Sequence, residues 1–157
     1  MSEEQKLDNI LPESPGCVSE AGMNKKKKVI NVLKNVLSKK DEILFAYLHG
    51  SFLDGFLFND IDIAIYLDEK RTHHKKNPGY QEQLSFQLSE LTRFVVDVHI
   101  MNQAPVGFKH SVFKHGQLLF SKDEELRSDL IEETSLEYMD FFELSKQYIK
   151  DMVYDGH

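Results

Sequence analysis

Residues 61–67 form the segment that most narrows the folds open to this chain. Apolar side chains occupy every second position: Ile61, Ile63, Ile65 and Leu67. Successive side chains of a β-strand point to opposite faces, so this alternation predicts a strand with one buried, aliphatic face. Asp60 and Asp62 fall in the opposite phase, and the strand therefore carries two carboxylates on its other face.

Helical and strand-like patterns alternate along the rest of the chain. Strands are predicted over 43–49, 94–101 and 117–121, and helices over 25–39, 80–93, 105–115 and 123–154, from the spacing of their apolar residues. Strands that alternate with helices predict an α/β domain in which helices pack on a sheet. In the last helix, eight residues at helical spacing predict a buried stripe: Leu130, Tyr138, Phe141, Phe142, Tyr148, Ile149, Met152 and Val153.

The length of 157 residues favours a single domain. Residues 1–23 mix charges with Pro and Gly and show no sustained period, which predicts a flexible N-terminal tail. The domain itself is expected over 24–157.

Composition restricts the class of protein. The net charge of −7 argues against a general nucleic-acid binder, so no direct nucleic-acid binding is expected. The single cysteine, Cys17, excludes an internal disulfide and a cysteine metal cluster. No signal peptide and no membrane-spanning apolar run are found in the sequence, and we therefore expect a cytoplasmic protein without a membrane partner.

A Gly-Ser pair, Gly50-Ser51, directly follows the predicted strand over 43–49. Glycine lets the backbone approach a phosphate closely, serine adds a hydroxyl donor, and a short helix predicted to follow would direct its N-terminal amides towards an anion. Alone, such a pair is an ordinary turn. Because carboxylates open the next strand, we interpret it as a candidate phosphate cradle.

Asp60 and Asp62 are candidate metal ligands. Their Cα atoms should lie roughly 7 Å apart on one face of the strand. Adjacent carboxylates repel each other unless a cation lies between them, and Mg²⁺ binds carboxylates together with substrate phosphate oxygens. The alternative is an exposed acidic pair without a function, against which the apolar character of the strand argues.

Asp97 is the third candidate ligand. It stands inside the apolar segment over 94–101, where a charge is costly unless it is paired, ligated or exposed at a sheet edge. If this strand lies beside the strand over 61–67, Asp97 completes a three-carboxylate site suited to two metal ions. If it is an edge strand, Asp97 can instead simply face water.

Other polar residues have more ordinary interpretations. His99 follows Asp97 at the same strand phase and could approach the site, although a packing or surface role is more common. Lys109 and Lys114 could reach a phosphate, but exposed lysines usually have no specific role. The many acidic residues over 123–143 favour a solvated helix face, which would also suit docking on a basic protein.

The combination of Gly50-Ser51, Asp60-x-Asp62 and Asp97 resembles the nucleotidyltransferase superfamily typified by DNA polymerase beta, and particularly its minimal one-domain members. This resemblance implies a small mixed sheet flanked by helices, with a long C-terminal helix. It also implies that Gly50 and Ser51 hold the phosphates of ATP. Asp60, Asp62 and Asp97 would ligate Mg²⁺ at a two-metal site, and Asp97 would activate the acceptor hydroxyl.

Downstream segments narrow the resemblance to the MntA-type antitoxins of HEPN/MNT toxin–antitoxin systems. They are Asn102-x-Ala104-Pro105, residues 112–120 (VFKHGQLLF) and residues 137–141 (EYMDF). The likeness covers roughly residues 29–150. It implies an adenylyltransferase that transfers AMP from ATP to a tyrosine of a HEPN-domain RNase toxin and thereby neutralises it.

Two other functions are compatible with the same residues. The chain could transfer a nucleotide to a small molecule such as an aminoglycoside, although few residues are left to build an acceptor pocket. It could also be an antitoxin that acts by binding alone. Eight residues separate Ser51 from Asp60, fewer than is usual in the family, and this shorter turn is the feature that favours a decayed nucleotide site.

Overall fold

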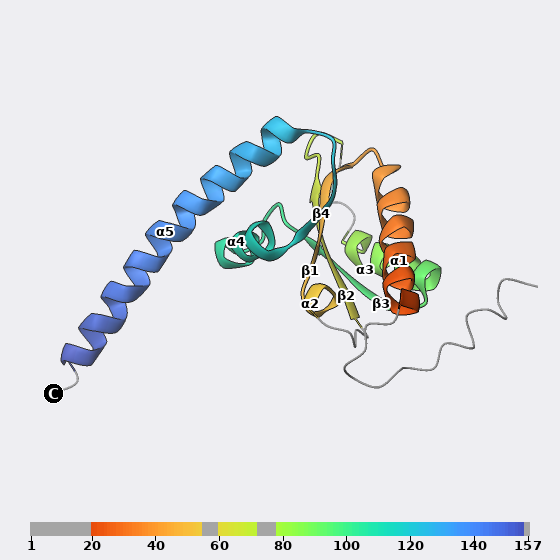
Figure 1. The fold of residues 1–157 in the computed structure, drawn as a ribbon. Helices are drawn as coiled ribbons and strands as arrows, with labels where there is room; N and C mark the ends of the chain where they lie inside the picture. The colour runs from red at the N-terminus through yellow and green to blue at the C-terminus, as the bar shows by residue number, and fades with distance from the viewer. Residues whose placement is uncertain (1–19, 55–59, 72–77, 156–157) are drawn as a thin grey trace, which may run out of the picture.

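A computed structural model describes residues 20–54, 60–71 and 78–155. Four strands form one mixed sheet in the order β3-β2-β1-β4 (Figure 1). The strands are β1 (Ile43–His49), β2 (Asp60–Leu67), β3 (Val95–Ile100) and β4 (Gln117–Ser121). β1 pairs antiparallel with β2 and β4, and β2 pairs parallel with β3. The predicted α/β class and all four predicted strands are confirmed.

Helices alternate with these strands along the chain. They are α1 (Glu20–Ser38), α2 (Ser51–Asp54), α3 (Tyr80–Thr92), α4 (Val106–His115) and α5 (Glu124–Asp155). α3 supplies the crossover that the parallel β2–β3 pair requires. α1 begins at Glu20, five residues before the predicted start at residue 25. Residues 20–23 of the expected N-terminal tail are therefore helical, and residues 1–19 lie outside the described residues.

One face of the sheet is covered by α1 and α3 and holds the main core. The aliphatic side chains of β2 on this face, Ile61, Ile63, Ile65 and Leu67, are fully buried, as their alternation predicted. Leu33 and Leu37 of α1 and Leu88 of α3 are fully buried in the same cluster. The burial of this apolar surface is the principal stabilising contribution to the domain.

The opposite face holds a smaller, more aromatic core. Phe45 and Tyr47 of β1 pack there with Val112 of α4, and Leu130 of α5 packs against the edge of the cluster. The ring of Phe45 stacks on that of Tyr66 with their centroids 5.0 Å apart. This face is therefore only partly closed by apolar packing, which leaves room for polar side chains nearer the sheet edge.

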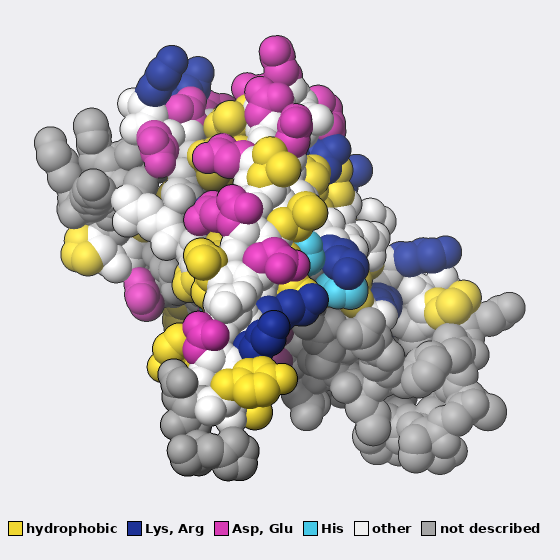
Figure 2. All heavy atoms as spheres, turned by 90° about the vertical axis from the view of Figure 1, so that its left-hand side faces the viewer, with side chains coloured by type: hydrophobic (Ala, Val, Ile, Leu, Met, Phe, Trp, Pro, Cys, Tyr) yellow, Lys and Arg dark blue, Asp and Glu magenta, His cyan; other side chains and the backbone are white. Residues whose placement is uncertain are grey.

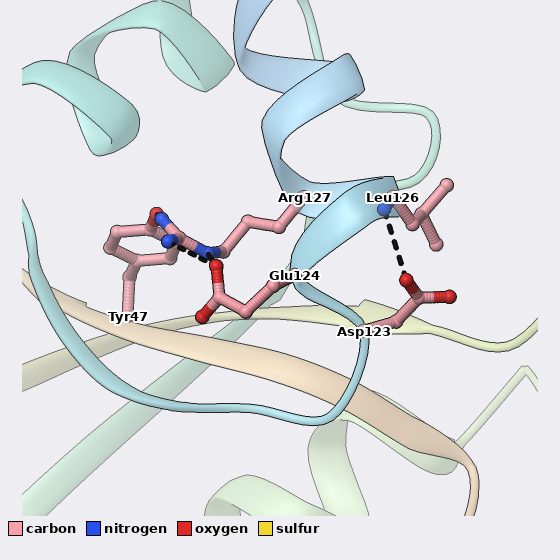
Figure 3. Close-up of polar contacts among 5 residues, drawn as sticks. All are labelled: Tyr47, Asp123, Glu124, Leu126 and Arg127. Atoms are coloured by element: carbon pink, nitrogen blue, oxygen red, sulfur yellow. Dashed lines mark hydrogen bonds and ion pairs between the residues drawn. The ribbon is translucent and has the colours of Figure 1, made fainter.

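Polar contacts fix the beginning of α5 against this second face (Figure 3). The carboxylate of Asp123 accepts a hydrogen bond from the backbone N–H of Leu126 at 3.0 Å, which caps the first turn. Arg127 donates to the hydroxyl of Tyr47 at 2.7 Å and forms an ion pair with Glu124 at 2.6 Å. The first turn of α5 is thereby tied to β1.

The prediction of a buried stripe along all of α5 is wrong for its second half. Leu130 and Tyr138 are partly buried, and α4 packs against α5. Beyond these residues α5 projects away from the sheet (Figure 1). The other six residues of the predicted stripe are between 47% and 66% exposed, and we call them the α5 stripe: Phe141, Phe142, Tyr148, Ile149, Met152 and Val153. Within the described part of the chain, no helix has the length and apolar character needed to cross a membrane.

Candidate functional site

The strand register places polar side chains in a row across three strands. His49 of β1 is paired with Asp62 of β2, and Asp62 is paired with Asp97 of the neighbouring β3. β3 therefore lies beside β2, which was the condition for Asp97 to join Asp60 and Asp62 as a third carboxylate. Because paired residues point to the same face, the three side chains lie on the partly closed side of the sheet, opposite the main core.

Asp62, Asp97 and His99 form a group that could bind a cation. One ligand atom from each lies within 4.8 Å of the other two. The Nε2 atom of His99 is 3.1 Å from a carboxylate oxygen of Asp97. β3 is an edge strand, and the Asp97 side chain is 55% exposed, so this residue both faces water and lies beside Asp62. Oxygen and imidazole ligands of this kind fit a divalent cation.

Asp60 lies outside this group. It is the first residue of β2, is paired with Val95 and is exposed. Strand alternation keeps it on the same face as Asp62. The site therefore has two carboxylates already close together and a third at the exposed beginning of the same strand.

Gly50 brings the turn after β1 against Asp62. Its φ of +81° is a left-handed conformation that glycine adopts readily. A Cβ atom at this position would lie 2.5 Å from Oδ2 of Asp62, a distance too short for any other residue without a local shift. Ser51 is the first residue of α2, so the predicted short helix after the Gly-Ser pair is confirmed. Residues 55–59, part of the short connecting turn, lie outside the described residues.

His49 is a residue of this site that sequence reasoning missed. Its Nε2 atom is buried and has no hydrogen-bond partner among the described residues. Burial lowers the pKa of His49 below its usual value, an effect that the neighbouring carboxylates of Asp62 and Asp97 partly oppose. Its position directly before Gly50 was visible in the sequence, but its neighbours depend on the cross-strand register.

α4 packs over the histidines at this end of the sheet. The ring of Phe108 lies 5.3 Å from that of His49 and 5.5 Å from that of His99, and the two imidazoles are 5.7 Å apart. Lys109 and Lys114 also lie on α4, the former partly buried and the latter exposed. The acidic group is therefore bordered on one side by an aromatic and imidazole cluster.

Residues 31–125 match a known protein family, Polymerase beta, Nucleotidyltransferase. The matched region begins in α1 and ends at the start of α5, so it includes the whole sheet and every residue of the candidate site. No match was found among curated proteins.

Solved structures share the fold at low sequence identity. A chain from the structure of the tri-AMPylated Shewanella oneidensis HEPN toxin in complex with MNT antitoxin is 18% identical, with a TM-score of 0.59; the alignment covers 84% of this chain and 98% of that one. A chain from the toxin–antitoxin MntA-HepT is also 18% identical, with a TM-score of 0.58 and coverage of 83% and 98%. A chain from the toxin–antitoxin with AMP-PNP is 19% identical, with a TM-score of 0.60 and coverage of 83% and 97%.

Proposed function

The chain belongs to the polymerase beta nucleotidyltransferase family, and from this premise we propose that it is an antitoxin that transfers AMP from ATP to a tyrosine of a HEPN-domain RNase toxin. The observation that carries the proposal is the convergence of Asp62 and Asp97 beside Gly50, on a face of the sheet that the core leaves open. This arrangement combines metal-binding carboxylates with a turn able to approach a phosphate.

The carboxylates suit a divalent cation and a triphosphate. In this proposal Asp60, Asp62 and Asp97 would hold Mg²⁺, which when bound offsets the negative charge of the transferring phosphoryl group. Gly50 would let the backbone approach the phosphates, with Ser51 at the beginning of α2 as a further donor. Gly50 has no side chain to obstruct Asp62, so the cradle and the carboxylate can act on the same nucleotide.

Transfer would proceed by direct displacement at the α-phosphorus. The tyrosine oxygen forms a bond to that phosphorus, the bond to the β-phosphate oxygen breaks, and pyrophosphate leaves. Asp97 would accept the proton of the tyrosine hydroxyl, and its exposed position on the edge strand is open to a large acceptor. Most of the rate acceleration would come from positioning and charge neutralisation.

The α5 stripe supports a protein as the acceptor. Exposed apolar surfaces of this kind mark binding sites for other proteins. Figure 2 views the molecule from the side towards which α5 projects and shows hydrophobic and acidic side chains interleaved there. We propose that the HEPN toxin covers this stripe, because the matching folds come from complexes of antitoxins with HEPN toxins and because an acidic helix suits a basic RNase. Both partners would then act in the cytoplasm, where ATP is available.

A purely binding antitoxin is the main competing function. The turn after Ser51 is short, and such an antitoxin would use the α5 stripe without any transfer chemistry. Transfer to a small molecule such as an aminoglycoside is the other competitor, but it gives the stripe no role.

Neutralisation by an Asp60→Ala variant separates catalysis on the toxin from neutralisation by binding alone. The variant and the wild type would each be co-expressed with the cognate HEPN toxin, and toxin activity and complex formation would both be measured. We expect the variant to bind the toxin but to leave it active. Full neutralisation by the variant would contradict catalysis and support binding alone. Glu90→Ala, which removes an exposed acid of α3 on the other side of the sheet, is the control and should neutralise normally.

A further inference from the structure

His99 is the member of the cation-binding group for which the proposed function has no role. Its Nε2 atom lies 3.1 Å from Oδ2 of Asp97, and its ligand atom lies within 4.8 Å of those of both Asp62 and Asp97. A nitrogen atom is therefore placed where the two carboxylates converge.

The fold restrains the His99 ring at this place. His99 shares a strand phase with Asp97, and the residue paired with it on β2 is Ala64, which is fully buried in the aromatic core. Phe108 packs against one part of the ring at 5.5 Å, and His49 lies 5.7 Å away. A ring held between neighbours loses little further freedom when it binds an ion.

We propose that His99 is a direct nitrogen ligand of the cation held by Asp62 and Asp97, and that it biases this site towards transition metals such as Mn²⁺ over Mg²⁺. The inference rests on the proposed function in one respect only, namely that the acidic site binds a metal. Mg²⁺ strongly prefers oxygen ligands and gives up water reluctantly, whereas imidazole is a favourable ligand for transition metals.

The competing role for His99 is to orient Asp97. An imidazole that only hydrogen-bonds a carboxylate leaves the metal with oxygen ligands alone, and its loss weakens all divalent cations together. A nitrogen ligand instead changes the spectrum of the bound metal and the relative affinity of two metals. These two signatures distinguish the roles.

The test uses the full chain with Mn²⁺ or Mg²⁺ added alone, without nucleotide or toxin. Electron spin echo envelope modulation of bound Mn²⁺ detects a directly coordinated imidazole nitrogen, and calorimetry gives the two affinities. We expect a nitrogen signal in the wild type that His99→Gln abolishes. In the same variant, affinity for Mn²⁺ should fall about tenfold or more, while affinity for Mg²⁺ changes less than about threefold.

Two histidine variants provide controls. His110→Gln changes a histidine of α4 that stacks on Tyr138 with ring centroids 3.8 Å apart, and it should leave the nitrogen signal unchanged. His49→Gln tests the other imidazole near the site and should also retain the signal. Thermal unfolding of each variant establishes that it is folded.

Absence of a nitrogen signal in the wild type, or its persistence in His99→Gln, would overturn the inference. An equal loss of affinity for both metals would also overturn it and would assign His99 the orienting role. The outcome is independent of the proposed transfer reaction. A protein with the expected Mn²⁺ signal that never modifies a toxin refutes the proposed function but supports the ligand.

Discussion

The two faces of the sheet differ in what they do, although the same strands build both. On one face of β2, Ile61, Ile63 and Ile65 are completely buried beneath α1 and α3. On the other face, Asp62 is only partly buried and lies beside an exposed Asp97 at the sheet edge. Strand alternation therefore divides stability and chemistry between the two faces within eight consecutive residues.

This division follows from the cost of burying charge. Carboxylates placed in the aliphatic core would require a large desolvation penalty without a partner. At the open face and near an edge strand, they remain accessible to water, to a cation and to a substrate. Substitutions on the open face should therefore change the transfer rate, and substitutions on the buried face should change the free energy of unfolding.

The largest expected effect comes from Asp62→Asn on the open face. Removing this carboxylate should slow AMP transfer roughly a thousandfold, because metal-assisted charge stabilisation contributes several kcal/mol to such reactions. The free energy of unfolding should change by less than about 1 kcal/mol. Transfer rates and urea unfolding of the same samples test this; a variant that keeps more than about a tenth of the activity would contradict the assignment.

The converse expectation concerns Ile63→Ala on the buried face. Ile63 is fully buried, and its truncation should lower the free energy of unfolding by about 2–5 kcal/mol through lost burial and the cavity that remains. The transfer rate per folded molecule should not change. Urea unfolding provides the measurement, and Val95→Ala, at a position 62% exposed, is the control with little expected change. A loss of transfer activity in folded Ile63→Ala would contradict the proposed division of stability and chemistry between the two faces.

A smaller effect is expected at the α5 stripe. Phe142→Ser in the α5 stripe should weaken binding of the HEPN toxin by about 2 kcal/mol, or roughly thirtyfold, if the stripe is the docking surface. Leu136→Ser, at an apolar position off the stripe that is 59% exposed against 47% for Phe142, should bind almost normally. Calorimetry of the two variants decides the point, and equal affinities would remove the stripe from the interface.

The smallest effect concerns Tyr80, at the beginning of α3 on the buried side. Its hydroxyl donates to Glu42 at 2.8 Å, and burial, with this carboxylate next in importance, raises the pKa of Tyr80 above its usual value of 10.0. Because the folded state holds the phenolic proton more tightly than the unfolded state, this contribution is complete below pH 10 and is lost at higher pH.

Tyr80→Phe should therefore cost about 1 kcal/mol of stability near neutral pH and reduce the loss of stability above pH 10. Urea unfolding between pH 7 and 11 measures both quantities. Tyr154→Phe, at an exposed position, should follow the wild type throughout. Identical pH slopes for Tyr80→Phe and the wild type would show that the buried phenol is not responsible.

Local patterns predicted most of the fold. The limits of β1 and β4 agree with their predicted ranges because turns and changes of period bound both strands. Glycine is a weak helix former, so the sequence predicted that α1 begins after Gly22. The helix nevertheless includes Gly22. These differences are confined to element ends, where local propensity is weakest.

The features that could not be predicted depend on which helices and strands lie beside one another in the folded chain. Periodicity correctly grouped the apolar residues of α5 on one face, but it contains no information on whether another element covers that face. The proximity of Asp62 and Asp97 could be stated only as conditional on strand order. His49 was missed because its place in the site depends on its pairing with Asp62, which sequence spacing alone does not specify.

The intact mass of the HEPN toxin tests the central claim most directly. The toxin would be incubated with this protein, ATP and Mg²⁺, with Asp62→Asn as the parallel control, and its tyrosines mapped by peptide fragmentation. Wild-type protein should add the mass of one or more AMP groups to toxin tyrosines, and the variant should add none. An unmodified toxin that is nevertheless bound and neutralised by folded wild-type protein would contradict it.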